Sequence, residues 1–234
     1  MKRKIVLKIG GSTLYQNDMD VNFALLEKLK QWYHSAKDEY SRIVIVTGGG
    51  VLSRDLHKKI EGNIANEDAL HSVAMSVTQT SAELVAGYLE DENIYTPKKL
   101  GDAYEYLLSD APGALVSGGL RSGWSTDMDA AVFADIISIN RVHKISNIDY
   151  LYTKNPKEYP DAEIIKDITW QDYFNLFEIK DDDEHQANLH IPVDKECARF
   201  SRTKNISFFI CGGVNIENSV DLEEILAEGT LIHP

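Results

Sequence analysis

The chain has 234 residues, of which 43% are hydrophobic, enough to form one large α/β domain or two closely joined lobes. Its 37 acidic and 24 basic residues give a formal net charge of −13, which disfavours DNA, RNA and anionic membranes as partners because these need clustered Lys and Arg. No apolar stretch approaches the roughly 20 residues of a membrane-spanning helix, and residues 1–4 are followed by a strand-length apolar run rather than by a signal peptide.

In chain order, the pattern of apolar residues predicts alternating strands and helices. A buried strand at 4–9 precedes a helix that Asp20 can cap, with Val21, Leu25, Leu29 and Trp32 at helical spacing. The next elements are a strand at 43–46, a helix from Leu52 to Lys59 and a long helix from Glu67 to Leu89. They are followed by a strand at 114–116, a helix capped by Ser125, Thr126 and Asp127, a strand at 143–145, and a last strand at 206–210 with a short helix at 217–227. Strands that alternate with helices predict a three-layer α/β/α sandwich with a mostly parallel central sheet.

Neither the cysteines nor the acidic run at 181–184 has the spacing of a metal site. Cys197 and Cys211 form no metal-type pair and lie in apolar or glycine-rich surroundings, so reduced thiols and a cytoplasmic location are expected. The acidic run lies near His185 and His190, but it lacks the alternating ligands and the turn glycine of a calcium loop. We interpret it as a solvated loop.

Three of the predicted strands end in consecutive glycines. The segments are Gly10-Gly11-Ser12, Gly48-Gly49-Gly50 and Gly118-Gly119, each after an apolar run. Glycines let backbone N–H groups approach a ligand with no Cβ in the way, and a helix that starts just after them favours an anion. Because parallel strands end along one edge of a sheet, where such sheets bind ligands, these segments predict a site for a polyanion.

Four motifs occur in a characteristic order along the chain. They are Lys8-Ile9-Gly10-Gly11-Ser12, then Thr47-Gly48-Gly49-Gly50 with Arg54, then Thr126-Asp127, and finally Ser146-Asn147-Ile148-Asp149-Tyr150-Leu151-Tyr152-Thr153-Lys154-Asn155-Pro156-Lys157. This arrangement resembles the amino acid kinase superfamily and, within it, most closely the UMP kinases of the archaeal type. The resemblance runs nearly end to end, and the segment at 146–157 carries most of its specificity because it follows the pattern "TNVDGVYTADPK" at most positions.

The resemblance implies transfer of the ATP γ-phosphoryl group to an oxygen of a small acceptor, with Mg²⁺ carried by the ATP phosphates. Such chemistry depends on positioning and on neutralising charge. Lys8 would be the catalytic lysine, Asp127 would orient it, and Arg54 would grip the acceptor phosphate. Without the resemblance, Lys8 and Arg54 would be read as solvated side chains.

The resemblance also assigns the binding residues. The phosphates would meet Gly10, Gly11, Ser12, Gly49 and Gly50, and the nucleotide would be bound by Thr126, Asn147, Asp149, Tyr152, Asn155 and Lys157. Tyr152 could instead simply pack. A single domain is expected over 1–234, with an acceptor-binding lobe at 1–140 and a nucleotide-binding lobe at 141–234. The relatives imply a homo-oligomer, a hexamer or a dimer, with the helix at 67–89 at the dimer contact.

The acceptor region departs from the family pattern. Along the helix at 67–89, archaeal UMP kinases carry Asp-x-x-Gly followed by Thr-Arg, where this chain has His71, Ala74, Thr78 and Gln79. His71 and Thr78 are the candidate acceptor-binding residues, and loss of the aspartate argues against efficient use of UMP. Tyr150 replaces a family glycine, where its ring would narrow or fill the nucleotide pocket.

A second relative leaves an alternative open. The segment Leu189-His190-Ile191-Pro192-Val193-Asp194 is similar to a segment of the molybdenum storage protein subunits, which share the fold and bind ATP. The alternative function is therefore an ATP- and oxoanion-binding protein with little or no kinase activity.

Overall fold

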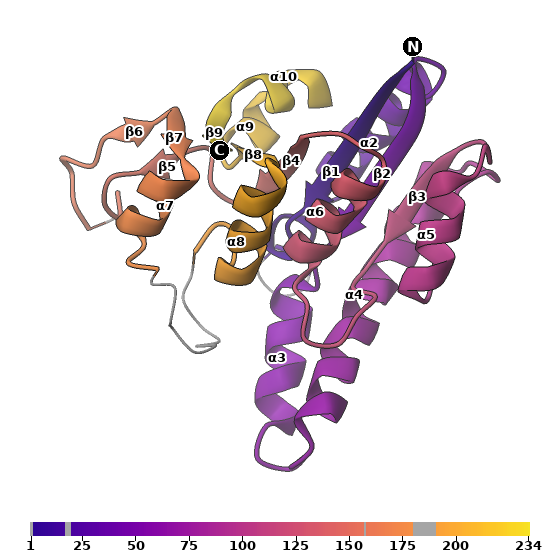
Figure 1. Ribbon diagram of the computed structural model, residues 1–234, viewed down its shortest axis with the longest axis horizontal. Coiled ribbons are helices and arrows are strands. Elements are labelled where there is room, and N and C mark those ends of the chain that lie inside the picture. The colour runs from indigo at the N-terminus through magenta and orange to yellow at the C-terminus, as the bar shows by residue number, and fades with distance from the viewer. Residues whose placement is uncertain (1, 17–19, 157, 180–190) are drawn as a thin grey trace.

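The fold is built around a seven-stranded sheet, as the computed structural model shows for residues 2–16, 20–156, 158–179 and 191–234 (Figure 1). The strands lie in the order β3-β2-β1-β4-β8-β9-β7. Their bounds are β1 Arg3–Ile9, β2 Tyr40–Thr47, β3 Ala114–Ser117, β4 Arg141–Ser146, β7 Asp167–Thr169, β8 Ser207–Gly212 and β9 Gly229–His233. Only β8 and β9 pair antiparallel within this sheet. The predicted three-layer, mostly parallel fold is confirmed.

Helices cover both faces of the sheet. They are α1 Gly11–Leu14, α2 Phe23–Ala36, α3 Gly50–Ile60, α4 Glu67–Leu89, α5 Leu100–Leu108, α6 Thr126–Ile136, α7 Trp170–Leu176, α8 Lys195–Lys204, α9 Asn215–Asn218 and α10 Leu222–Ala227. A separate antiparallel pair consists of β5 (Leu151–Tyr152) and β6 (Ile164–Ile165). Figure 1 shows α3 and α4 projecting together beyond the sheet. This projection places their facing surfaces beside the strand ends.

Alternation along the central strands divides the core into two layers. On β1, Val6 packs with α5, α6 and α8, whereas Leu7 and Ile9 pack with α2, α4 and α10 on the other face. Successive side chains of a strand point to opposite faces, so a strand covered on both faces must be apolar throughout. This requirement explains the continuous apolar runs of the sequence, and it makes a charged residue within a central strand conspicuous.

Two predicted helix boundaries were wrong. Helix α2 is capped by Asn22 rather than by Asp20, because the Asn22 side chain accepts a hydrogen bond from the Leu25 N–H at 3.1 Å. The predicted helix at 217–227 is interrupted, since α9 ends at Asn218 and α10 begins at Leu222. Asp221 caps α10 by accepting from the Glu224 N–H at 3.0 Å. In both cases the helix begins where a side chain can bind its free N–H groups.

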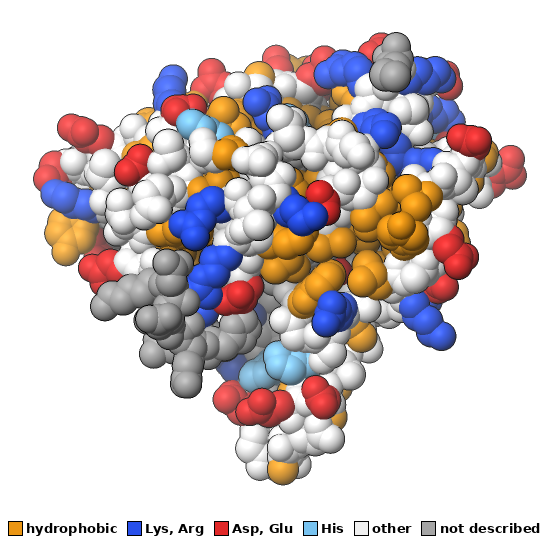
Figure 2. Space-filling view, viewed as in Figure 1, with side chains coloured by type: hydrophobic (Ala, Val, Ile, Leu, Met, Phe, Trp, Pro, Cys, Tyr) orange, Lys and Arg blue, Asp and Glu red, His pale blue; other side chains and the backbone are white. Residues whose placement is uncertain are grey.

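The surface carries charges of both signs. On the face that Figure 2 shows, Lys and Arg side chains are interspersed with Asp and Glu side chains, and histidine and acidic side chains gather on the projecting α3–α4 pair. Within the described residues, no helix is both long enough and apolar enough to cross a membrane. The acidic run at 181–184, with His185 and His190, lies outside the described residues.

Candidate active site

The glycine segments after β1 and β2 lie against each other at one edge of the sheet. A Cβ built on Gly11 would lie 1.9 Å from the Gly50 nitrogen, and one built on Gly50 would lie 2.2 Å from the Gly11 carbonyl oxygen. Gly50 also has a φ of 58°, a conformation that favours glycine. Two backbone turns therefore meet directly, and side chains at either position would separate them.

These turns also present helix N-termini to the edge. Gly11 begins α1, Gly49 caps α3 and Gly50 begins α3, so they stand where helix N–H groups lack intrahelical acceptors. The predicted donor role of Gly10 needs a correction, because its N–H donates to the Ile145 carbonyl at 2.8 Å. Ser12 is half-buried within α1. The start of α3 therefore offers the better anion-binding backbone.

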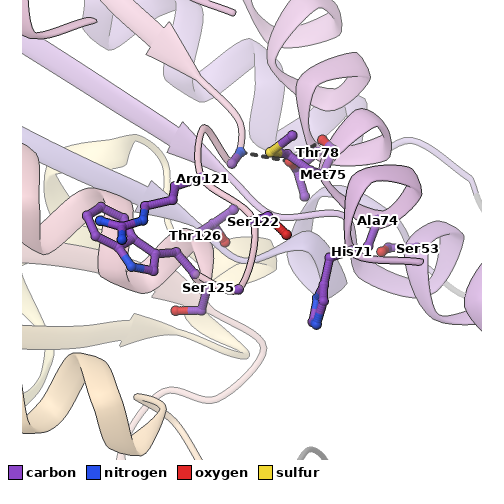
Figure 3. A pocket seen from close by; sticks show the side chains of 12 residues that line it. Ser53, His71, Ala74, Met75, Thr78, Arg121, Ser122, Ser125 and Thr126 are labelled. Atoms are coloured by element: carbon purple, nitrogen blue, oxygen red, sulfur yellow. Dashed lines mark hydrogen bonds between the residues drawn. The ribbon is translucent and has the colours of Figure 1, made fainter. Parts of the chain in front are cut away.

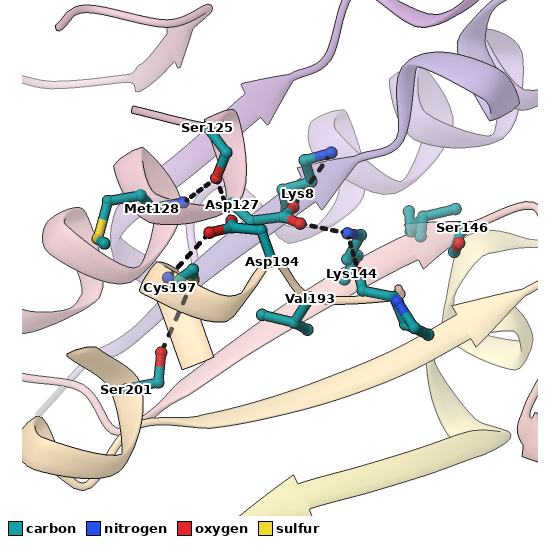
Figure 4. A network of polar contacts seen from close by, with 12 residues as sticks. Lys8, Ser125, Asp127, Met128, Lys144, Ser146, Val193, Asp194, Cys197 and Ser201 are labelled. Carbon is teal, nitrogen blue, oxygen red and sulfur yellow. Dashed lines mark hydrogen bonds and ion pairs between the residues drawn. The ribbon is translucent and has the colours of Figure 1, made fainter. Parts of the chain in front are cut away.

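Lys8 and Lys144 converge on one carboxylate. They are paired residues of the parallel neighbours β1 and β4, so their side chains leave the same face of the sheet, beneath α6. Lys8 Nζ lies 3.2 Å from Asp127 Oδ1, and Lys144 Nζ contacts Asp127 Oδ2 (Figure 4). All three residues are at least 90% buried. The structure thus joins the predicted pair Lys8–Asp127 to a second lysine that sequence analysis missed.

The electrostatics of this group favour an anionic ligand. Burial alone would raise the pKa of Asp127, but Lys144 and Lys8 outweigh it and hold that pKa below its usual value. Burial lowers the pKa of Lys8, and the charge of Asp127 opposes this change. Lys8 and Lys144 thus face one carboxylate in poorly solvated surroundings, and the carboxyl of Asp194 is a further acidic group close to them. A ligand with several negative charges, such as a phosphate, suits two lysines held in this way.

A second carboxyl, that of the half-buried Asp194, lies close to Lys144. Lys144 Nζ also donates to the Pro192 carbonyl, and Asp194 caps α8 by accepting from the Glu196 and Cys197 N–H groups at 3.1 and 3.0 Å. Ser125, the cap of α6, donates to the other Asp194 oxygen (Figure 4). The N-termini of α6 and α8 are therefore tied together beside the two lysines.

The predicted nucleotide-binding residues follow β4 as one segment. Tyr152 donates to Asp149 Oδ1 at 3.2 Å, and a Cβ on Gly213 would lie 2.4 Å from the Asp149 nitrogen, so the segment packs against the end of β8. Asn147 is exposed, and so is Asn155, which donates to Glu158 at 2.8 Å. Lys157 lies outside the described residues.

Tyr150 is fixed inside the protein. It is 8% exposed, and its hydroxyl donates to Glu228, which precedes β9. This hydrogen bond to a carboxylate is the main cause that raises the pKa of Tyr150 to about 12. The ring therefore fills space between the segment after β4 and the C-terminal strand.

A pocket of about 260 Å³ lies between α4 and the loop that follows β3 (Figure 3). It is lined by Ser53 of α3, by His71, Ala74, Met75 and Thr78 of α4, and by Gly119, Arg121, Ser122, Gly123, Trp124, Ser125 and Thr126. The predicted acceptor residues His71 and Thr78 and the predicted nucleotide residue Thr126 thus share one cavity. The glycines after β2 connect this cavity to the lysine group. A Cβ on Gly49 would lie 2.5 Å from Ser53 Cβ, which lines the cavity, and one on Gly48 would lie 3.4 Å from Lys8 Nζ.

Two neighbouring residues of α4, Thr78 and Gln79, hold the loop that forms one wall of the pocket. Thr78 Oγ1 accepts from the Gly119 N–H at 2.7 Å, and Gln79 donates to the Gly119 carbonyl at 3.1 Å. The guanidinium of Arg121 lies over the Trp124 ring, with its central carbon 4.6 Å from the ring centroid. Arg54 is exposed on α3 and is not among the lining residues. Arg121 is therefore the guanidinium of the cavity.

Comparisons with known proteins identify a family and a shared fold. The model of the amino acid kinase family matches residues 3–212. The uridylate kinase of Methanococcoides burtonii is 29% identical, with 96% of this chain and 92% of that protein covered, and that of Thermococcus sibiricus is 25% identical, with 99% and 100% covered. The solved uridylate kinase of Archaeoglobus fulgidus superimposes with a TM-score of 0.73 at 23% identity, covering 98% of this chain and 100% of that chain, which shows a shared fold.

Proposed function

Because the chain belongs to the amino acid kinase family, we propose that it transfers the γ-phosphoryl group of ATP to a small phosphate-bearing acceptor, in the manner of a nucleoside monophosphate kinase. The observation that carries this proposal is the convergence of Lys8 and Lys144 on Asp127 at the sheet edge where α3 begins. Two ammonium groups beside a helix N-terminus suit a group that carries several negative charges while it moves.

The reaction needs little from the protein besides position and charge. The bond between the γ-phosphorus and the bridging oxygen of ATP breaks, and a bond forms from an acceptor phosphate oxygen to the same phosphorus. A phosphate monoester loses its second proton near pH 6, so its oxygen is already a nucleophile at neutral pH and requires no general base. Lys8 and Lys144 would stabilise the charge on the transferring group, while Asp127 would hold them in place.

The side chains of the site also fit a nucleotide whose phosphates already bind Mg²⁺. The oxygens of Asp127 face lysines, and no group of three or more His, Cys, Asp or Glu side chains within the described residues could hold a metal. The start of α3, where Gly49 is the cap and Gly50 the first helical residue, presents free helix N–H groups that suit phosphates. Mg²⁺ would therefore be coordinated mainly by the phosphates of ATP.

The two lobes would divide the substrates. Residues 1–140 contribute all of the lining residues of the pocket and would bind the acceptor. Residues 141–234 would bind ATP through Asn147, Asp149, Tyr152 and Asn155, with Lys157. Arg121 is a better placed candidate than Arg54 for the acceptor phosphate, because it lines the cavity. Two buried free thiols, Cys197 and Cys211, support the proposal that the protein works in the cytoplasm.

The test is ADP release with ATP and Mg²⁺ in the presence of nucleoside monophosphates, small carboxylic acids, molybdate or tungstate. Release that depends on a phosphate-bearing acceptor supports the proposal. ATP binding without release, together with binding of molybdate or tungstate, would instead support the alternative of an oxoanion-binding protein.

A further inference from the structure

Asp129 is a buried carboxyl that takes no part in the lysine group. It lies on α6 two residues after Asp127 and its exposure is 0%. Among the described residues, neither oxygen accepts a hydrogen bond of normal geometry, although the Leu120 N–H lies nearby. Burial raises the pKa of Asp129 to about 7, and the nearby backbone N–H of Leu120 opposes this change. Because an ionised carboxylate is unfavourable without a partner, this site favours the neutral acid.

The carboxyl lies directly behind the wall of the pocket. A Cβ built on Gly119 would lie 3.8 Å from Asp129 Oδ2, 3.3 Å from Thr78 Oγ1 and 3.4 Å from Met75 Cγ. Gly119, Thr78 and Met75 all line the pocket, as Figure 3 shows for the two labelled side chains. A residue without a side chain therefore separates the Asp129 carboxyl from whatever occupies the cavity.

On the pocket side, the titratable or charged side chains nearest to Asp129 are His71 of α4 and Arg121, which line the cavity itself. Other charged side chains on the elements packed against α6 are engaged elsewhere. On β1, β4 and α8 they pair as Lys8 and Lys144 with Asp127, Asp194 with Ser125, and Lys204 with Asp135, while Arg42 of β2 donates to the Ser109 and Ala111 carbonyls. Asp102 and Glu105 of α5 are exposed to solvent. Burial and the Leu120 backbone determine the pKa of Asp129, and no charged side chain contributes to it. A charge that enters the pocket would therefore change this pKa without competition from a fixed counter-ion.

We propose that Asp129 sets the charge preference of the acceptor pocket by taking up a proton from solvent when an anionic acceptor binds, so that affinity for anions falls as Asp129 ionises. The inference rests on the proposed function in that it treats the cavity as the acceptor site. A phosphate against Gly119 and an ionised Asp129 behind it would repel each other through a layer that excludes water, which strengthens the repulsion. Asp129 would thus determine specificity without touching the acceptor, because it is not among the lining residues of the pocket.

The expected size follows from linkage. If an anionic acceptor raises the Asp129 pKa by about one unit, affinity falls by about fivefold to tenfold between pH 6 and pH 8.5. The second ionisation of the phosphate, near pH 6, changes affinity over the same range. That contribution is a property of the probe, so it is the same in a variant that cannot titrate at this position.

The experiment measures binding without ATP, by calorimetry at pH 6 and pH 8.5, with UMP, CMP and glycerol 3-phosphate as probes. Asp129→Asn keeps the shape of the neutral acid and cannot ionise, and Asp135→Asn is the matched control on the exposed side of the same helix. We expect wild type and Asp135→Asn to lose fivefold to tenfold more affinity than Asp129→Asn as pH rises. Equal pH dependence in all three proteins, or no binding of any probe at pH 6, would overturn the inference.

The outcome is separable from the proposed function. Binding with the expected Asp129-dependent profile, but without phosphoryl transfer when ATP and Mg²⁺ are added, would support this inference and contradict the kinase proposal. In the opposite case, phosphoryl transfer occurs but the affinity for the acceptor has the same pH dependence in Asp129→Asn as in wild type. That result would support the kinase proposal and contradict this inference.

Discussion

Lys8 Nζ lies 3.2 Å from Asp127 Oδ1, in a position where both side chains are almost completely shielded from water. Lys144 occupies the other oxygen of the same carboxylate, so Asp127 separates two ammonium groups on neighbouring strands. The carboxylate therefore has a structural role, because it keeps two like charges together. It also has a proposed functional role, because it holds both ammonium groups near the edge of the sheet.

Removing Asp127 should destabilise the protein strongly. In Asp127→Ala, two buried lysines lose their counter-ion, and breaking a buried ion pair in this way costs about 3–5 kcal/mol. The folded-state pKa of Asp127 is lowered, so its stabilising contribution is present above its unfolded-state pKa and is lost as pH falls through the lower folded-state value. Chemical denaturation at pH 7 measures the change. Asp161→Ala, which breaks an exposed pair with Lys154, is the control, and a loss no larger than in that control would contradict the assignment.

Replacing Asp129 should stabilise the protein at alkaline pH, in contrast to replacing Asp127. Its folded-state pKa of about 7 lies above the usual 3.8, so between these values the folded protein holds a proton that the unfolded chain releases. Stability therefore falls as pH rises through this window, by on the order of 4 kcal/mol, and stays low above it. Asp129→Asn should be more stable than wild type at pH 8 and less sensitive to pH. Parallel denaturation curves for the two proteins from pH 5 to pH 8 would refute this.

UMP should be a poor acceptor for the wild-type protein. A carboxylate at position 71 could accept two charge-assisted ribose hydroxyl bonds, each contributing about 1.5–3 kcal/mol, whereas neutral histidine offers one acceptor nitrogen. His71 lines the pocket, as this argument requires. We expect His71→Asp to raise kcat/KM for UMP by about tenfold to a hundredfold. A wild-type kcat/KM of about 10⁴ M⁻¹s⁻¹ or more would show that UMP is an ordinary substrate.

The protein should be a homo-oligomer, as its family resemblance implies. Part of the 23-residue helix α4 faces the core through Val77, Val85 and Leu89, and another part packs on α2 and α3 or lines the pocket. We expect a second copy to contact its remaining exposed surface. Sedimentation at micromolar concentration should give a multiple of the 26.3 kDa chain mass, with a hexamer or a dimer expected. A measured mass equal to that of one chain would contradict the prediction.

The strands that position the site were predictable because of their burial on both faces. Helix α4 was predicted from Glu67 to Leu89 and has those bounds, since Asn66 caps it and its apolar positions recur at helical spacing. In contrast, α8 was missed because its sequence is mostly polar and charged. Its start depends on Asp194, whose partners Ser125 and Cys197 come from tertiary and local contacts that no periodicity reveals.

The site was predicted only in part, for a similar reason. Lys8 and Asp127 were found through motifs, whereas Lys144 lies inside a predicted apolar strand and was passed over. A lysine in a strand buried on both faces requires a buried partner, and this signal could have identified it. Asp129 carried no motif at all. Its importance depends on its distance from Gly119, which only the fold determines.

The central claim is that Lys8 acts on a transferring phosphoryl group. The most direct measurement follows ADP and phosphorylated acceptor together, with ATP, Mg²⁺ and the best acceptor of the panel, in wild type, Lys8→Ala and the surface control Lys30→Ala. Wild type and Lys30→Ala should form the two products in equal amounts, and Lys8→Ala should turn over about 10²–10³ times more slowly while remaining folded. ADP without phosphorylated acceptor in wild type, or near wild-type transfer by a folded Lys8→Ala, would contradict the account.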